Sequence, residues 1–319
     1  MELEKIKEHI DDVLVETNFK NLGNKKVCKV RDIYTMEDKI ILVSTDRHSS
    51  FDRIIAYVPF KGEVLNQISL FWFEKTKDII QNHVLNTPDP NVVVVKKCSP
   101  LPIECVMRGY ITGVTGTSLW THYKDGKRDF GNFVLPDRLK KNQKLEEPVF
   151  TPTTKSDEHD RPITPTEIVS EGLLSQEMTD ELEKTAKALF KRGQEIALSH
   201  GLILVDTKYE FGLDENGKLT LIDEIHTPDS SRYWKADTYE ERFNKGEEPE
   251  YFDKEFLRIW FKDNCDPYKD KVLPKAPAEL VAELSRRYIE IYEKITGKSF
   301  EHDFNTPIIE RITNNLTKI

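Results

Sequence analysis

The segment VDTKYEFGLDENGKLTLIDE, residues 205–224, contains charged side chains at a regular spacing. Asp206, Lys208 and Glu210 alternate with uncharged residues, so in an extended strand all of them lie on one face. Carboxylates suit a hard metal ion, and cations suit phosphate oxygens. This alternation therefore indicates a candidate site.

A turn signal follows the charged run. Asn216-Gly217 predicts a two-residue type I′ turn, and in that register Glu210 lies directly opposite Asp223. Like charges at opposed positions repel, so we expect a cation there, and Mg²⁺ binds one or two carboxylates together with phosphate oxygens. Two alternatives stay open: a hairpin whose charges only face water, and a four-residue loop, which shifts the register.

Motifs of the common phosphate-binding loops are absent. The chain has no GxxxxGK[ST] loop, no GxGxxG after a predicted strand, no GxSxG elbow and no HExxH pair. If phosphates bind, they are held by side-chain cations and a metal. Lys29 and Arg31 in CKVRDIY alternate on a predicted strand and are candidates. Taken alone, the pair also fits an ordinary solvated strand face.

A second polar cluster follows a predicted strand in STDRHSSFDR. It contains Asp46, Arg47, Ser49 and Asp52. Functional residues often gather at strand ends, but a turn or a helix cap explains the same residues. Both interpretations stay open.

The apolar run LPIECVMRGYITG contains two charged residues, Glu104 and Arg108. Both have even numbers, so both side chains lie on the same face of a strand. Arginine offers a planar fork that binds carboxylate or phosphate with two hydrogen bonds. The alternative is a structural ion pair between Glu104 and Arg108.

Two polar loops add further candidates. TPDSSRYW places Asp229 and Arg232 directly after the acidic hairpin, and FTPTTKSDEHD contributes Lys155, His159 and Asp160. His159 is a candidate general base, and a solvated loop histidine is the alternative.

The composition predicts a globular protein of more than one lobe. The 319 residues include 47 Lys and Arg against 56 Asp and Glu, and the net charge of −9 argues against a general binder of nucleic acid or anionic membranes. No run approaches the roughly 18 apolar residues of a membrane span, and MELEKIKEHIDDVL lacks a signal-peptide core. The cysteines lack metal-binding spacing, so we expect reduced thiols in a cytoplasmic, stand-alone protein.

Strand-like runs dominate the first third of the chain and helical periodicity dominates the last, which predicts an α+β fold. Strands are expected at 39–46, 91–97 and 103–111, helices at 62–83, 176–200, 253–264 and 277–297, and a long functional loop at 112–166. We expect an antiparallel-sheet N-terminal lobe at 1–112, a mixed central lobe at 113–265 and a helical part at 266–319. A ligand cleft would lie between the first two lobes.

Together, these segments are similar to a known family. The chain resembles the SAICAR synthases (phosphoribosylaminoimidazole-succinocarboxamide synthases), the ATP-dependent ligases of de novo purine synthesis. The main matches are LPIECVMRGYITG, LVDTKYEFG and DEIHTPDSSRYW, supported by KVRDIY, TDRHSSFD, LNQISLFWF, FTPTTKSDEHD and the tail FLRIWF…RRYIEIYEKITG. The likeness runs from about Lys25 to about Ser299, and the tail looks like the longer, fungal-type form.

The resemblance implies an ATP-grasp-like α+β fold with ATP held between lobes. The implied reaction joins the carboxylate of carboxyaminoimidazole ribonucleotide (CAIR) to the amine of L-aspartate through an acyl phosphate, while ATP becomes ADP and phosphate. The implied partners are these small molecules and Mg²⁺, without nucleic acid or membrane, in a monomer or small homo-oligomer.

The resemblance also implies roles for individual residues. Lys208, Glu210 and Asp223 would form the catalytic group, in which Glu210 and Asp223 hold Mg²⁺. ATP would be bound by Lys29, Arg31, Glu104 and Lys208. The ribonucleotide would be bound by Arg108, Ser118, Lys155, Asp160, Asp229 and Arg232.

Two departures from the family pattern affect these roles. Cys28 stands where the family usually has a glycine before Lys29, which predicts a stiffer loop. The chain reads TGVTGTS where the family tends to read TGS, so Ser118 is assigned after a short insertion. The functional alternatives are a small-molecule kinase, another ATP-dependent ligase and a nucleotide-binding regulator without turnover.

Overall fold

The structure is a computed structural model that describes residues 1–51, 53–114, 116, 118–155, 160–252 and 255–317. Asp52 and His159, named above, lie outside the described residues. The chain forms two compact units: unit 1 consists of 1–71, 83–97 and 252–319, and unit 2 of 72–82 and 98–251. The sequence predicted three consecutive segments, divided at residues 112 and 265. The two units do not test this division, which stays a prediction.

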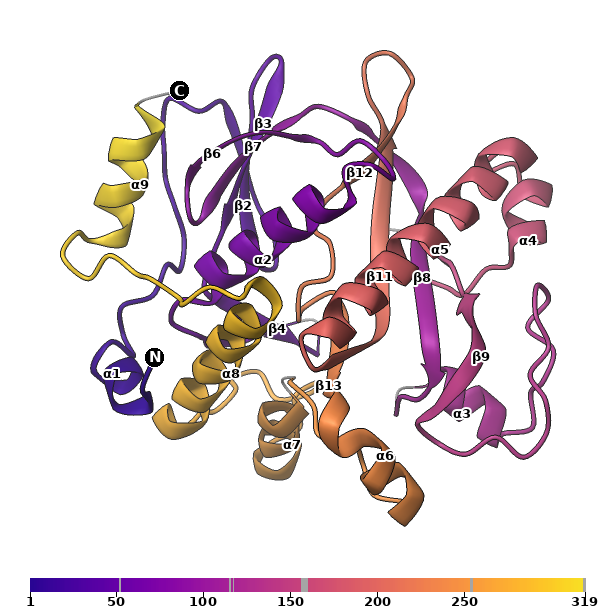
Figure 1. Cartoon of the computed structure of the whole chain (residues 1–319). Helices are drawn as coiled ribbons and strands as arrows, with labels where there is room; N and C mark the ends of the chain where they lie inside the picture. Colours follow the sequence, from indigo (N-terminus) through magenta and orange to yellow (C-terminus); the bar gives the residue numbers. More distant parts are fainter. Residues whose placement is uncertain (52, 115, 117, 156–159, 253–254, 318–319) are drawn as a thin grey trace. The chain divides into compact units, whose positions relative to one another are not determined.

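Unit 1 is built on an antiparallel sheet with the strand order β1-β2-β3-β7-β6 (Figure 1). The strands are β1 (Asn24–Val27), β2 (Arg31–Thr35), β3 (Lys39–Ser44), β6 (Val84–Asp89) and β7 (Val92–Lys96). β-Branched residues dominate β3 and β7 and favour strands. Alternate residues of β3 belong to two different hydrophobic clusters. Ile41 and Val43 belong to one cluster, and Leu42 belongs to the other. Both faces of the sheet are therefore buried.

A two-stranded hairpin and several helices complete unit 1. The hairpin is β4 (Arg47–Ser50) with β5 (Arg53–Tyr57), and the helices are α1 (Leu3–Glu8), α7 (Glu255–Asn264), α8 (Ala278–Thr296) and α9 (Ile308–Leu316). Helix α2 (Lys61–Thr76) begins in unit 1, and its residues from Trp72 belong to unit 2. Helix α1 contacts α8, and α9 contacts β6 (Figure 1).

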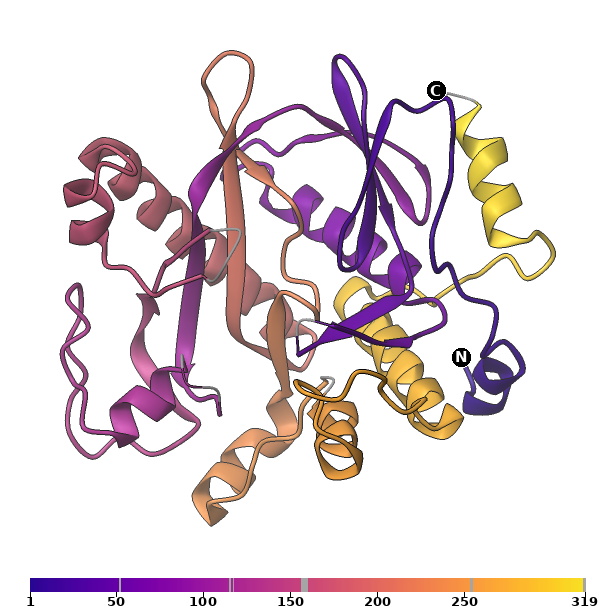
Figure 2. The same cartoon turned by 180° about the vertical axis from the view of Figure 1, so that it is seen from behind.

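Unit 2 is built on a second antiparallel sheet, with the order β10-β8-β11-β12. Strand β9 also pairs with β8, and β13 also pairs with β11. The strands are β8 (Ser99–Ile111), β9 (Gln143–Phe150), β10 (Thr153–Thr154), β11 (Leu202–Leu213), β12 (Leu219–Ile222) and β13 (Ser231–Lys235). The long strands β8 and β11 lie side by side in both views (Figure 1 and Figure 2).

Helix α5 (Gln176–Ser199) packs against β8 and β11. Ser175 caps its first turn by accepting a hydrogen bond from the backbone of Met178. Its buried residues follow helical spacing and include Leu182, Ala186, Leu189 and Ala197. The other helices of unit 2 are α3 (Leu119–Lys124), α4 (Pro165–Ser170) and α6 (Ala236–Lys245).

Two predicted elements differ from the structure. The helix expected at 62–83 ends at Thr76, whose hydroxyl bonds back to the carbonyl of Trp72 at 2.8 Å. The stretch 112–166, expected to be a loop, contains α3, β9 and β10. Apolar residues dispersed along this stretch, among them Leu119 and Leu135, form a hydrophobic cluster of their own.

The predicted two-residue hairpin turn is wrong by one register position. The ladder pairs Glu210 with Ile222, not with Asp223. Strand β12 ends at Ile222, and Asp223 has a φ of 67°. The Glu210–Asp223 pairing expected from the turn is therefore absent from the ladder.

The side chain of Asp214 explains the difference. Its Oδ1 accepts hydrogen bonds from the backbone of Asn216 at 3.0 Å and of Lys218 at 2.9 Å. Gly217 donates its N–H to the carbonyl of Asp214 at 2.9 Å and has a φ of 73°. These bonds favour a three-residue loop with a left-handed glycine, which shifts the pairing by one residue.

No helix in the described part of the chain is long and apolar enough to cross a membrane. The four cysteines all lie in that part and are free, in agreement with the prediction of reduced thiols.

A buried ion network holds helix α9 in unit 1. Arg311 donates to Asp89 at 3.1 and 3.3 Å and to the Asn91 amide oxygen at 2.5 Å. Its Nη1 also lies 3.4 Å from Glu63, which in turn bonds to His302 at 2.7 Å. A cation removed from such a site leaves its buried carboxylates uncompensated.

We expect Arg311→Met to lower the free energy of unfolding by about 3–5 kcal/mol in urea titrations, because Asp89 loses its buried counter-ion. Arg286→Ala is the matched control. Arg286 bonds to Glu283 and Glu290 on α8 but is more exposed, so its loss should cost about 1 kcal/mol or less. Equal losses in the two variants would contradict the structural role of the Arg311 network.

Candidate active site

Charged residues of β8, β11 and β13 share one face of the unit 2 sheet. The ladders place Glu104 opposite Glu210, and both Arg108 and Arg232 opposite Asp206. Directly opposed residues point to the same face, as do residues two apart along a strand. The charged face predicted from the alternation in β11 is therefore confirmed.

An ammonium group lies between the opposed carboxylates. Lys208 Nζ donates to Glu104 Oε1 at 2.8 Å and to Glu210 Oε1 at 2.6 Å. Lys155 pairs with the second carboxylate oxygen of Glu210, and the hydroxyl of Thr153 donates to Glu104 at 3.3 Å. Glu210 therefore has an opposed acid, as expected, but that acid is Glu104 and not Asp223. Lys208 and Lys155 offset the repulsion between the two carboxylates.

The pKa of Lys208 shows how strongly this group is coupled. Burial would lower the pKa, but the carboxylates of Glu210, Asp223 and Glu104 outweigh burial and raise it. Lys208 is therefore charged at neutral pH. Asp223 is close enough to act on Lys208 although it lies outside the ladder.

A second charged group lies beside the first. Arg232 Nε donates to Asp206 Oδ1 at 3.0 Å, and Arg232 Nη2 forms an ion pair with Asp206 Oδ2 at 2.8 Å. Arg108 Nη1 lies 3.9 Å from the same carboxylate. Arg108 Nε donates to the hydroxyl of Thr151 at 2.9 Å. The alternative of an ion pair between Arg108 and Glu104 is wrong, because each residue has its partner on β11. Glu104 pairs with Lys208, and Arg108 pairs with Asp206.

Two guanidinium groups share one carboxylate here, so this group is net positive. Burial lowers the pKa of Arg108, the carboxylate of Asp206 raises it in part, and Arg232 lowers it again. An excess of guanidinium in a partly buried site favours an anion such as phosphate or carboxylate.

Ser118 lies near this arginine group. A methyl group added to Gly113 would come within 3.0 Å of Ser118 Oγ and 3.4 Å of Arg232 Nη1. Gly113 has a φ of 106°, which favours glycine. Ser118 also caps α3 by accepting a bond from Thr121 at 3.3 Å.

The segment after β12 is held by a buried aromatic cluster. His226 bonds to the hydroxyl of Tyr209 at 2.5 Å, and its carbonyl accepts from Tyr233 at 2.6 Å. The indole ring of Trp72 contacts His226 edge to face. The backbone N–H of Lys208 donates to the carbonyl of Ser230 at 3.2 Å. These contacts fix the chain on either side of Asp229.

Lys29 and Arg31 belong to unit 1. The structure differs from the predicted strand face: Lys29 lies exposed in the turn between β1 and β2, and Arg31 is the first residue of β2. Cys28 does not have a positive φ, so its side chain is accommodated without backbone strain. Among the other predicted residues, Asp160 is exposed in the described chain and Asp229 is half-buried.

Sequence reasoning placed Asp206 on the charged face of the strand but assigned it no ligand, and it assigned no role to Thr151 or Thr153. The threonines donate or accept across the β8 ladder, and their only signal is their place in FTPTTKSDEHD.

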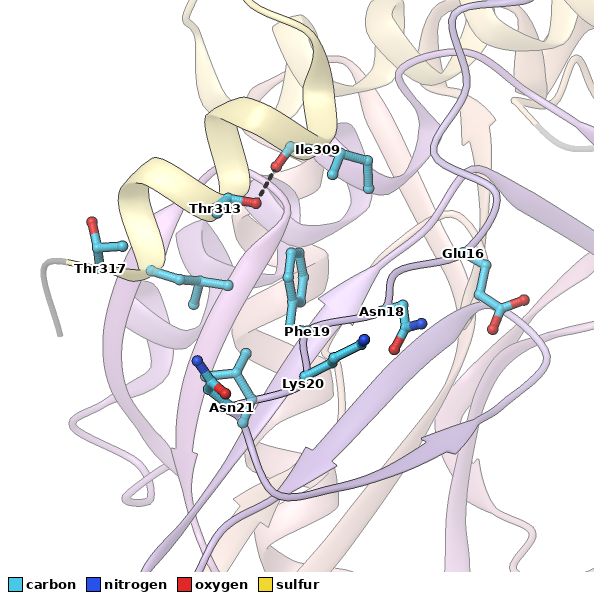
Figure 3. Close-up of a pocket in the computed structure, with 10 residues that line it drawn as sticks. Glu16, Asn18, Phe19, Lys20, Asn21, Ile309, Thr313 and Thr317 are labelled. Atoms are coloured by element: carbon cyan, nitrogen blue, oxygen red, sulfur yellow. Dashed lines mark hydrogen bonds between the residues drawn. The ribbon is translucent and has the colours of Figure 1, made fainter.

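Figure 3 shows a pocket of about 710 Å³ in unit 1, between segment 16–22 and helix α9. Phe19 and Leu22 line it from the segment, and Ile309 and Leu316 from the helix. Of the described residues that line it, none is a predicted site residue.

The described residues contain no group of three or more His, Cys, Asp or Glu side chains that could hold a metal ion by themselves. Mg²⁺ requires fewer protein ligands, because it commonly takes one or two carboxylates and completes its shell with phosphate oxygens and water. The carboxylates near Lys208 have the hard oxygen donors that suit this ion.

The known proteins that this chain resembles belong to one family. A model of the SAICAR synthetase family matches residues 26–275. The chain is 57% identical over 306 residues to a phosphoribosylaminoimidazole-succinocarboxamide synthase of Legionella pneumophila (strain Paris), covering 96% of this chain and 98% of that protein. It is 54% identical over 318 residues to the chloroplastic enzyme of the same name from Arabidopsis thaliana, covering 98% and 77%.

The solved structures that are similar to this chain belong to the same family. A SAICAR synthase from Saccharomyces cerevisiae complexed with SAICAR matches with a TM-score of 0.78 and 30% identity, over 91% of this chain and 100% of that one. A SAICAR synthetase in complex with ADP matches with a TM-score of 0.66 and 27% identity, over 88% and 100%.

The mixed α+β fold with antiparallel sheets is therefore that of the SAICAR synthases, as expected. The chain belongs to the SAICAR synthetase family. It is an ATP-dependent ligase that joins CAIR and L-aspartate in purine biosynthesis.

The buried state of His226 predicts a pH dependence of stability. Burial lowers its pKa from 6.5 to about 3. Below pH 6.5 the unfolded chain binds a proton that the folded chain does not, so stability is full above that pH and falls as the pH drops. We expect this residue to lower the free energy of unfolding by about 2 kcal/mol between pH 7 and pH 5.

His226→Gln keeps a polar partner for Tyr209 but cannot titrate. Urea titrations at pH 7 and pH 5 should show a pH-dependent loss smaller by about 2 kcal/mol in this variant. The same loss in both proteins would show that His226 is not buried in its neutral form.

Proposed function

We propose that the charged face of the unit 2 sheet binds the reacting groups of the ligase. The observation that carries this proposal is the adjacency of two groups on one face: Lys208 between Glu104 and Glu210, and the two arginines on Asp206. The first group suits a metal and the phosphates of ATP, and the second suits an anionic ribonucleotide.

On the nucleotide side, Glu210 and Asp223 would hold Mg²⁺, and Lys208 would contact ATP. Glu104, on strand β8, contacts ATP as well and keeps Lys208 in place through their 2.8 Å hydrogen bond. When bound, Mg²⁺ supplies positive charge against the phosphate oxygens during phosphoryl transfer. Lys29 and Arg31 bind the phosphates of ATP. We also propose that the fold is ATP-grasp-like.

On the substrate side, Arg108 and Arg232 bind the ribonucleotide. Their shared carboxylate, Asp206, holds Arg232 through one hydrogen bond from Nε and an ion pair with Nη2, and so restrains the direction of its guanidinium group. Ser118 joins them through its position near Arg232 and Gly113.

Three further residues complete the proposed substrate side. Lys155 is held by its ion pair with Glu210, which brings a second lysine to the carboxylate. Asp229 is positioned by the turn in which its N–H donates to Thr227 Oγ1 at 3.3 Å. Asp160 belongs to the same polar segment, FTPTTKSDEHD, as Lys155.

The chemistry requires this separation of charge. A carboxylate is a poor acyl donor, because its leaving group would be oxide, and phosphorylation by ATP converts it into an acyl phosphate. Lysine and arginine neutralise the phosphoryl oxygens in that step. The amine of aspartate then attacks, and phosphate leaves. The amine attacks in its deprotonated form, so a base accepts its proton.

The test of the proposal is ADP release with ATP, Mg²⁺, CAIR and L-aspartate, with one component omitted at a time. We expect release to require all of them and to fall by a factor of roughly 10² or more in Glu210→Gln, because the carboxylate charge next to Lys208 is lost. Glu250→Gln is the control, since Glu250 pairs with Lys235 elsewhere in unit 2. Full activity of Glu210→Gln would refute the metal assignment.

A second test addresses the substrate side. Arg232→Lys keeps the charge but loses the planar guanidinium and its Nε hydrogen bond to Asp206, so we expect the KM for CAIR to rise about tenfold or more while the KM for ATP changes little. Arg192→Lys, which alters a surface pair with Asp78, should change neither constant. A selective rise in the KM for ATP would instead place Arg232 on the nucleotide.

A further inference from the structure

A buried asparagine holds the end of strand β8. Asn142 directly precedes β9, and its backbone N–H donates to the carbonyl of Ile111 at 2.7 Å. Its side-chain oxygen Oδ1 accepts a hydrogen bond from the hydroxyl of Thr112 at 2.6 Å. Asn142 is 4% exposed and Thr112 is 6% exposed. One buried residue therefore bonds to two consecutive residues at the end of β8.

The backbone of Asn142 has a conformation that few residue types adopt. Its φ of 67° lies in the left-handed region, in which asparagine is several-fold enriched. The hydroxyl of Tyr239, on α6, donates to the carbonyl of Asn142 at 2.8 Å, so both backbone groups of Asn142 have protein partners. The side chain consequently reaches Thr112 from a backbone that is itself fixed.

A carboxylate fixes the orientation of the Asn142 amide. Asn142 Nδ2 donates to Glu248 Oε2 at 2.9 Å, and Lys141 pairs with Glu248 Oε1. Burial would raise the pKa of Glu248, but Lys141 and Asn142 outweigh it and lower the pKa, so Glu248 is ionised at neutral pH. An ionised carboxylate only accepts hydrogen bonds, so it faces the NH₂ group of the amide, and the amide oxygen faces the hydroxyl of Thr112.

Thr112 lies where the chain reaches the substrate side of the candidate site. Its carbonyl accepts from the backbone N–H of Trp120 at 3.3 Å, so α3 begins beside the end of β8 (Figure 1). The next residue is Gly113, where an added methyl group would overlap with Ser118 Cβ and come within 3.4 Å of Arg232 Nη1. Thr112 is therefore adjacent to two residues of the proposed ribonucleotide side.

We propose that Asn142 is a positioning residue for the ribonucleotide, which acts by fixing Thr112 at the end of β8. Both polar groups of its side chain have protein partners, so Asn142 acts on the substrate through Thr112 and not by contact. Fixing Thr112 holds Gly113 against Arg232 and keeps the start of α3, with Ser118, at the arginine group. The inference rests on the proposed function, which assigns Ser118 and Arg232 to the ribonucleotide.

The test is steady-state kinetics of the full chain, with ADP release measured against CAIR and against ATP. Thr112→Val removes the hydroxyl but keeps the shape of the side chain, so Asn142 Oδ1 loses its donor. We expect the KM for CAIR to rise about fivefold or more, while kcat and the KM for ATP change less than about twofold. Thr112→Ser retains the hydroxyl and should keep the KM for CAIR within about twofold of the unsubstituted protein.

Thr179→Val is the matched control. Thr179 is also buried in unit 2, and its hydroxyl donates to the carbonyl of Ser175 at 2.9 Å, at the start of α5. This variant should lower the free energy of unfolding by about 1 kcal/mol, as Thr112→Val does, but change neither KM. An unchanged KM for CAIR in folded Thr112→Val, or equal rises in the KM values for CAIR and ATP, would overturn the proposal.

A second variant keeps the test valid if Thr112→Val does not fold. Asn142→Gly removes the side chain, and glycine adopts the positive φ without strain. We expect the same selective rise in the KM for CAIR. Adding Thr112→Val to Asn142→Gly should produce no further rise, because the bond between the two side chains is already absent. Independent, multiplying effects of the two substitutions would show that Asn142 does not act through Thr112.

Ser118→Ala and Arg232→Lys separate this inference from the proposed function. If both leave the KM for CAIR unchanged, the assignment of the substrate side is itself wrong. If they raise the KM for CAIR but folded Thr112→Val and Asn142→Gly do not, only the positioning role of Asn142 is overturned.

Discussion

The ammonium group of Lys208 lies between two carboxylates, Glu104 and Glu210, that the β-ladder places directly opposite each other. Without a cation this pairing would oppose strand association, since like charges at opposed positions repel. Lys208 and Lys155 pair with these acids and offset the repulsion in a partly buried site. The same carboxylates have oxygen atoms that suit a metal ion, so the proposed metal site uses the arrangement of charge that stabilises the strand pairing.

The sheet determines which charges meet. Strand β11 pairs with β8 on one side and with β12 and β13 on the other, so residues from three strands reach the same face. Along that face the groups change from acidic around Lys208 to net positive around Asp206. In the proposed function, the acidic end of this face binds the metal and ATP and the positive end binds the ribonucleotide, so each anionic reactant has its own counter-charge.

Much of this face could be predicted from local pattern. The alternation of Asp206, Lys208 and Glu210 was sufficient for a common face, because strand geometry has a fixed period. The hairpin register was not predictable from Asn216-Gly217, since the Asp214 side chain accepts two turn N–H groups and adds a residue to the loop. Glu104 could not be identified as the partner of Lys208, because 104 residues separate them and only the ladder brings them together.

That sequence separation has a consequence for folding kinetics. The charge cluster exists only after β8 and β11 have closed a loop of about a hundred residues, whereas the turn between β1 and β2 joins strands adjacent in the chain. Contacts between distant segments form late, because the entropy of loop closure is lost before the contact is gained. During synthesis, strand β8 with Glu104 is therefore complete well before Lys208 has been translated. Until then, water and salt screen the carboxylate of Glu104.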